Sequence, residues 1–170
     1  MPKEHLNPRE LPNWAETFSQ IVVVRTTAAR LIWVSGQVAV DADNRVVGPG
    51  DLAQQAEYAF GNLSMALEAA GASLDDVVRL GIYVKNLRHE DRAVIRKALR
   101  RVFVRDTLPT STWLGVTSLA LDELLIEVEA TAVIELNDVA PPNITVQRTS
   151  ARGSRQESLG TDRRDRHPEP

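Results

Sequence analysis

Apolar residues along the chain form short runs separated by polar segments, and these runs predict strands. Residues 21–24, all Ile or Val, predict one strand, and the apolar residues 31–34 predict a second strand joined to it as a hairpin. A Ser-Gly-Gln sequence at residues 35–37 interrupts the second strand, which we expect to continue over residues 38–40. Residues 41–50 contain Asp, Asn, Gly and Pro and therefore predict a loop.

The clearest helix is predicted to begin after Asp51, whose side chain can cap a helix N-terminus. Apolar residues then recur at steps of three or four: Leu52, Ala56, Phe60, Leu63, Leu67 and Ala70. Gly71 is well placed to end this helix in the left-handed conformation. A turn at residues 73–76 follows, and the β-branched residues of 77–84 predict the next strand.

The remaining elements are a second helix and two strands. Residues 90–104 predict a helix with apolar residues inward and Arg and Lys outward, residues 112–116 a short strand, and residues 124–134 the last strand. The order β-β-α-β-α-β-β indicates an α+β sheet with two helices on one face. Because residues 77–84 are apolar in both registers, we expect another subunit to cover the second face.

Composition narrows the class of protein. The 170 residues are 43% hydrophobic, contain no Cys and carry a formal net charge of -3. Thiolate metal sites and Cys nucleophiles are therefore excluded, and no basic field favours nucleic acid. Residues 1–136 form the predicted domain, with its folded elements from about residue 10, whereas residues 137–170 are rich in Arg and Pro and predict a disordered tail. Without a signal-like or membrane-spanning apolar stretch, a cytoplasmic protein with no membrane partner is expected.

Several segments occur together in an order typical of one family. They are FSQ at 18–20, VSGQ at 34–37, GDL at 50–52, LEAAGASLDDVV at 67–78, YVKN at 83–86, Pro109, and IEVE at 126–129. In these segments the chain resembles the Rid family (reactive intermediate deaminase, also called RidA/YjgF and often labelled endoribonuclease L-PSP). The resemblance implies a chorismate-mutase-like α+β fold and a homotrimer with small-molecule clefts between subunits. It further implies hydrolysis of enamines or imines to a keto acid and ammonia, with no metal or organic cofactor.

The resemblance also points to individual site residues. Glu127 aligns with the family glutamate that is assigned to positioning water, which makes it the candidate catalytic residue. Ser35 and Gly36 stand where family members line the cleft with a hydroxyl and backbone groups. Other interpretations remain open: Glu127 as a solvent or interface salt-bridge residue, and Ser35 as a strand hydroxyl bonded to the backbone.

The chain departs from the family at the substrate anchor. Ser111 stands where a family Arg clamps the substrate carboxylate, and a neutral hydroxyl replaces neither its charge nor its fork geometry. Phe18 stands where Tyr is common, and Arg96 or Val94 where Asn is typical. Arg96 is a candidate replacement cation or part of a solvated helix face. Trp113 is a strand anchor or a cleft wall, and beside Ser111 it would suit a larger, less acidic ligand.

Two functions are consistent with these residues. The first is a divergent Rid-type hydrolase of a larger imine or enamine, with Glu127 handling the water. The second is a ligand-binding or regulatory module that kept the trimer and cleft but lost catalysis, and the missing Arg and Asn favour this second function. The three His residues are dispersed, so we predict neither a metal site nor a Ser-His-Asp triad. The acidic net charge argues against ribonuclease activity.

Overall fold

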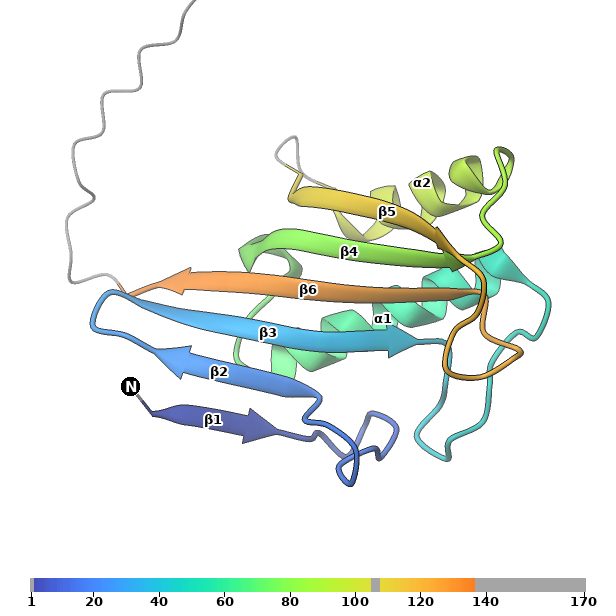
Figure 1. Ribbon diagram of the computed structural model, residues 1–170. Helices are drawn as coiled ribbons and strands as arrows, with labels where there is room; N and C mark the ends of the chain where they lie inside the picture. The colour runs from blue at the N-terminus through green and yellow to red at the C-terminus, as the bar shows by residue number, and fades with distance from the viewer. Residues whose placement is uncertain (1, 105–107, 137–170) are drawn as a thin grey trace, which may run out of the picture. The chain divides into compact units, whose positions relative to one another are not determined.

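The computed structural model describes residues 2–104 and 108–136, which form one mixed sheet with two α-helices on the same side (Figure 1). The elements are β1 (Lys3–Leu6), β2 (Ile21–Arg25), β3 (Ala29–Val38), α1 (Leu52–Ala69), β4 (Val77–Lys85), α2 (Asp91–Val102), β5 (Thr110–Val116) and β6 (Ile126–Glu135), with a short 3-10 turn at Leu74–Asp76. The strand order in the sheet is β1-β2-β3-β6-β4-β5. This arrangement confirms the predicted α+β class.

Helix α1 begins and ends where the sequence predicted. The Asp51 carboxylate accepts hydrogen bonds from the backbone N–H groups of Ala53 at 2.9 Å and Gln54 at 3.1 Å, which satisfies two unpaired donors of the first turn. Gly71 follows the helix with φ of 67°, a conformation that suits Gly. Neither helix of the described part combines the length and apolar character that a membrane span requires.

Strand β6 lies in the middle of the sheet, antiparallel to both β3 and β4, and β5 adds to β4 in parallel. The core fills the space between the sheet and the two helices; its largest buried side chains include Phe60, Leu63, Ile82, Ile95 and Phe103. The register of β3 against β6 shifts between Val34 and Gln37. The predicted interruption at residues 35–37 is therefore a local irregularity within one continuous strand.

The sequence prediction was wrong at the N-terminal edge. The folded part was expected from about residue 10, but β1 pairs antiparallel with β2, with His5 opposite Val22. The residues of β1 are mostly exposed and show no apolar alternation, so the backbone pairing carried no sequence signal. Strand β5 also begins two residues earlier than predicted, at Thr110. The predicted tail at 137–170 lies outside the described residues.

The face of the sheet opposite the helices has no covering element among the described residues. Trp33 and Leu114 lie on it and are 43% and 48% exposed. Trp33 is flanked across the strands by Val22 and Thr131, so apolar area continues over neighbouring strands. Large apolar side chains at such exposure are typical of an interaction surface. A covering subunit, which the sequence predicted for this face, stays a prediction.

Candidate active site

A pocket of about 310 Å³ lies on the side of the sheet away from the helices, over β3 and β6. We call it the candidate pocket. Its lining residues are Trp14, Phe18, Ser35, Gly36, Val38, Ala120, Glu127 and Glu129. Four of the residues singled out in the sequence therefore meet here: Phe18, Ser35, Gly36 and Glu127.

Glu127 is the acidic side chain of this pocket that has no partner. Its carboxylate lies directly over Gly36 on the neighbouring strand, where a Cβ atom on Gly36 would overlap Oε1. No hydrogen bond or ion pair joins the Glu127 carboxylate to another residue of the described ranges. Burial raises the pKa of Glu127 above its ordinary 4.5, and the negative charge of Glu129 raises it further. A carboxylate of raised pKa beside a pocket is suited to accept a proton from a bound water.

Glu129, two residues along the same strand, is held in place. Its Oε1 accepts a hydrogen bond from the Tyr83 hydroxyl at 2.9 Å. The same oxygen forms an ion pair with Arg79 Nη1 at 3.5 Å. The carboxylate lies over Gly81 of β4, as Glu127 lies over Gly36 of β3. The hydrogen bond to Glu129 raises the pKa of Tyr83, and burial adds to the shift. The two glutamates therefore differ: Glu129 is bonded and partly neutralised, whereas Glu127 is available to a ligand.

An aromatic pair lines the same pocket as these two acids. Residues 14–18 make a single helical turn, in which the backbone N–H of Phe18 donates to the Trp14 carbonyl at 3.1 Å. The spacing of four residues brings the two rings together edge to face, with centroids 5.6 Å apart and planes at 61°. This spacing was the sequence signal that could have identified Trp14, which sequence reasoning did not place in the site.

Ser35 ties this N-terminal segment to β3. Its hydroxyl donates to the Ser19 carbonyl at 2.8 Å, and its backbone N–H donates to the Gln20 carbonyl at 2.9 Å. The hydroxyl is thus bonded to the backbone, as one of the two sequence interpretations had it. A hydroxyl has one proton, so Ser35 Oγ presents only acceptor lone pairs to a ligand.

Two buried amides lie behind the same segment. Gln37 Nε2 donates to Gln20 Oε1 at 2.8 Å, and Gln20 Nε2 donates to the Pro12 carbonyl at 2.9 Å. Both side chains are nearly inaccessible to solvent. Each hydrogen bond therefore replaces one that the amide would otherwise make with water. These bonds fix the path of residues 12–20 across β3 and with it the position of the aromatic pair.

The other three predicted residues lie elsewhere in the chain. Ser111 and Trp113 are on β5, which β4 separates from β6, and Trp113 Nε1 donates to Ser111 Oγ at 2.9 Å while its ring packs on the core. Arg96 is exposed on α2, and α2 covers the side of the sheet away from Glu127. None of these three lines the candidate pocket within one chain, so their binding roles stay predictions that require a neighbouring copy.

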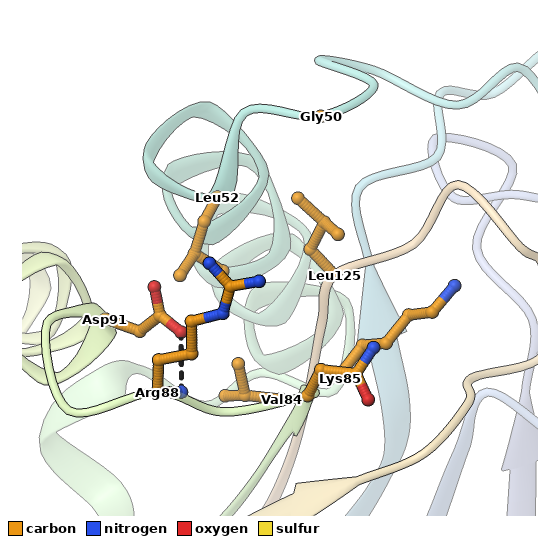
Figure 2. A pocket seen from close by; sticks show the side chains of 8 residues that line it. Gly50, Leu52, Val84, Lys85, Arg88, Asp91 and Leu125 are labelled. Atoms are coloured by element: carbon orange, nitrogen blue, oxygen red, sulfur yellow. Dashed lines mark hydrogen bonds between the residues drawn. The ribbon is translucent and has the colours of Figure 1, made fainter.

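A second pocket, of about 320 Å³, lies where β4 ends near the starts of α1 and α2 (Figure 2). Its charged lining residues are Lys85, Arg88 and Asp91. The Asp91 carboxylate accepts the Arg88 backbone N–H at 2.8 Å, and Lys85 Nζ donates to the Asp122 carbonyl at 2.8 Å. The Arg88 side chain turns toward the start of α1, and Lys85 extends away from it (Figure 2). None of the predicted site residues lines this second pocket.

The part of the chain that the structure describes contains no cluster of side chains suited to bind a metal ion. No group of three or more His, Asp or Glu side chains there is arranged to hold a metal ion. The candidate pocket therefore offers two carboxylates, one hydroxyl and an aromatic wall, a set of groups suited to binding a small molecule and handling a proton.

Comparison with known proteins identifies the class. The mixed sheet with two helices on one face is the chorismate-mutase-like fold: the crystal structure of the YjgF gene product from Escherichia coli matches with a TM-score of 0.64 at 28% identity, over 76% of this chain and 98% of that one. The chain belongs to the Rid/YjgF family, since it matches the endoribonuclease L-PSP family over residues 9–134.

Two curated relatives show the range of this similarity. A RutC family protein from Pyrococcus abyssi is 32% identical over 135 residues, which cover 79% of this chain and all of the relative. A 2-iminobutanoate/2-iminopropanoate deaminase from Dermatophagoides farinae is 28% identical over 134 residues, which cover 79% of this chain and 98% of the relative. The resemblance noted in the sequence is thereby confirmed at the level of the family and the fold.

Proposed function

We propose that this protein hydrolyses a small imine or enamine to a carbonyl compound and ammonia, in a cleft between two subunits of a homotrimer. The observation that carries the proposal is the Glu127 carboxylate, which faces a pocket without a bonding partner in the described chain and has a raised pKa. Relatives named as deaminases of 2-imino acids support the reaction class.

The chemistry needs one water and two proton transfers. Water adds to the C=N carbon while a proton reaches the nitrogen, which gives a carbinolamine. The C–N bond then breaks, ammonia leaves, and the hydroxyl oxygen becomes the carbonyl. Glu127 takes a proton from the attacking water and passes it to the imine nitrogen, then takes the hydroxyl proton of the carbinolamine and passes it to the departing nitrogen, so that the carboxylate ends as it began. The raised pKa of Glu127 makes it a stronger base toward the water than an ordinary carboxylate. Neither step changes an oxidation state, so the reaction needs no redox cofactor.

A neighbouring copy completes the site in this proposal. The candidate pocket and the exposed side chain of Trp33 lie on the same helix-free face, so packing that buries Trp33 also shelters the pocket from bulk water. By the family resemblance, the neighbouring subunit contributes Ser111 and Trp113 from its β5 strand.

The test is hydrolysis of imines formed in situ, followed as loss of the semicarbazone produced by a trapping reagent. We expect acceleration by the full-length protein, loss of that acceleration in Glu127→Gln, and full rate in Glu135→Gln. The control removes the same charge from the exposed far end of β6. We also expect little acceleration for 2-aminoacrylate, because Ser111 offers no cation to its carboxylate. Equal rates in Glu127→Gln and the wild-type protein would contradict the proposal.

A further inference from the structure

The polar side chains of the candidate pocket are nearly all acceptors. Glu127 and Glu129 supply carboxylate oxygens, and the Ser35 hydroxyl has already donated its proton to Ser19. Among the lining side chains, the indole N–H of Trp14 is the one remaining donor group. A ligand that satisfies this pocket therefore brings N–H or O–H donors of its own.

The charges of the lining residues also favour a ligand that is a donor and not an anion. None of the eight lining residues is basic, and two are acidic. The nearest bonded cation, Arg79, is paired with Glu129 at 3.5 Å and lines an adjacent hollow. Glu127 keeps an uncompensated negative charge when it is ionised. An anionic ligand would lose hydration and meet this charge without a counter-ion, whereas a cationic ligand would pair with it.

The aromatic wall also favours a cation. The Trp14 and Phe18 rings line the same pocket as Glu127, and Phe18 is 37% exposed, so part of its surface is open to a ligand. Aromatic rings attract ammonium and iminium groups that lie over their faces. A positive group placed between Glu127 and Phe18 would be stabilised from both sides.

The hollow that adjoins the candidate pocket at the aromatic pair is mostly apolar, with Thr17 and Asn44 as its polar lining residues. This hollow of about 350 Å³ shares Trp14, Phe18 and Ala120 with the candidate pocket, and Val40 and Leu121 add further apolar surface to it. Neither hollow has a charged lining residue apart from the two glutamates. The polar pocket and the apolar hollow together accommodate a ligand with a charged nitrogen at one end and an apolar group at the other.

We propose that the candidate pocket selects a nitrogen cation, such as an iminium or ammonium group, attached to an apolar group and lacking a carboxylate. The inference rests on the proposed function and names its substrate class. It differs from the 2-imino acids that appear in the names of the deaminase relatives. Ser111, expected at this cleft from the neighbouring copy, is neutral, and so are its neighbours Thr110 and Thr112, so this segment supplies no Arg or Lys to a carboxylate.

Calorimetric titration of the full-length protein tests the charge preference without any turnover. The probes are phenethylammonium, phenylacetate and neutral phenethyl alcohol, which share one ring and differ in charge. We expect phenethylammonium to bind about tenfold or more tightly than phenylacetate, a difference set by one charge pair. Equal binding of the two ions, or tighter binding of phenylacetate, overturns the inference.

Three variants test whether the preference for a cation arises from residues of the candidate pocket. Glu127→Gln is expected to weaken phenethylammonium binding about tenfold, whereas Glu135→Gln leaves it unchanged. Phe18→Leu keeps an apolar side chain at an exposed position, so folding is preserved, and is expected to weaken the cation about two- to fivefold while binding of the alcohol changes less. An equal loss of cation binding in Glu135→Gln and Glu127→Gln overturns the assignment to this pocket.

A pair of imines separates this inference from the proposed function. Oxidation of phenethylamine by a flavin amine oxidase, with O₂ reduced to H₂O₂, gives an imine without a carboxylate. Oxidation of phenylalanine by an amino acid oxidase gives the imino acid with the same side chain. Faster, Glu127-dependent hydrolysis of the imine without a carboxylate supports both proposals. Faster hydrolysis of the imino acid overturns the inference and leaves the function standing. If phenethylammonium binds but neither imine is hydrolysed faster, the result supports the inference and contradicts the proposed function.

Discussion

Two glycines decide where the two acidic side chains of the site lie. Gly36 and Gly81 flank β6 on either side, and the carboxylates of Glu127 and Glu129 lie over them in opposite directions. A side chain at either glycine would occupy the space that the carboxylate now uses. The different roles of the two glutamates thus depend on residues that have no side chain of their own.

Gly36→Ala is expected to displace Glu127 and slow imine hydrolysis about tenfold or more, because catalysis requires the carboxylate at one position. The thermal midpoint should change little, since the obstructing atoms are the far end of a flexible side chain. Gly61→Ala, within α1 and with no atom near a new Cβ, is the control: it should stabilise the fold by about 0.5–1 kcal/mol and leave the rate unchanged. A full rate in Gly36→Ala would refute this account of Gly36.

The raised pKa of Glu127 predicts how the stability of the fold depends on pH. A carboxyl whose pKa is higher in the folded chain binds more protons there than in the unfolded chain. Its contribution therefore favours folding at low pH and is lost as pH rises from about 4.5 through the raised value. Glu127→Gln should accordingly raise the thermal midpoint at neutral pH and have less effect in acid. A lower midpoint for Glu127→Gln at neutral pH would contradict this sign.

At the residue scale, sequence comparison predicted half of the candidate pocket. Phe18, Ser35, Gly36 and Glu127 belong to segments with a family pattern, so their proximity was foreseeable. Ala120 comes from the loop between β5 and β6, a segment with no recognisable motif. The hydrogen bond to Glu129 comes from Tyr83 on the neighbouring strand β4. The pairing of β4 with β6 brings these two residues together, and the sequence did not reveal that pairing.

At the scale of elements, a buried amide joins α1 to the strand that carries the site. Asn62 on α1 is 2% exposed, and its Nδ2 donates to the carbonyls of Val38 at 2.9 Å and Val40 at 3.0 Å. These carbonyls come directly after the irregular part of β3, where the regular sheet ladder stops. One helix side chain therefore donates to the backbone where the regular pairing of β3 ends, next to the candidate pocket.

Asn62→Ala is expected to destabilise the fold by about 1–3 kcal/mol, because the Val40 carbonyl would lose the side-chain donor and the Val38 carbonyl would keep only the Val40 backbone N–H. Chemical denaturation measures this difference. Ser64→Ala, on the same helix with an exposed hydrogen bond to Glu68, should change stability by less than about 0.5 kcal/mol. Equal stabilities of the two variants would show that the bonds from Asn62 contribute little.

The helices and strands with a regular spacing of apolar residues were the ones that the sequence predicted best. Helix α1 has a cap, a regular apolar spacing and a terminal Gly, and its bounds were found within a residue. Strand β1 has none of these and joins the sheet by pairing with the backbone of β2, so the sequence did not reveal it. Local signals predict an element only when its own side chains, rather than its neighbour's backbone, determine its conformation.

At the scale of the whole molecule, the sequence predicted the layers but not the strand order. The position of β6 between β3 and β4 depends on pairing between residues far apart in the chain, such as Trp33 with Thr131 and Tyr83 with Glu127. The apolar residues on both faces of the sheet did predict that one face would lack cover within the chain. Trp33 and Leu114 are the exposed side chains that correspond to that prediction.

Trp33→Glu is expected to dissociate the proposed homotrimer, because burying a carboxylate without a partner is unfavourable. Sedimentation equilibrium would show monomers, and imine hydrolysis would be lost with the cleft. Met65→Glu, at a similarly exposed apolar position on α1, should leave the assembly intact. A trimer that persists in Trp33→Glu, or a wild-type protein that is monomeric, would contradict the proposed assembly.

The pH dependence of imine hydrolysis tests the central proposal most directly. The value of kcat/KM, corrected for the rate without enzyme, reports the ionisation of the free protein. If Glu127 accepts the proton of the attacking water, the rate falls in acid with a pKa above 4.5, and this limb disappears with the activity in Glu127→Gln. An acid limb and a rate that are the same in Glu127→Gln as in the wild-type protein would contradict the proposal.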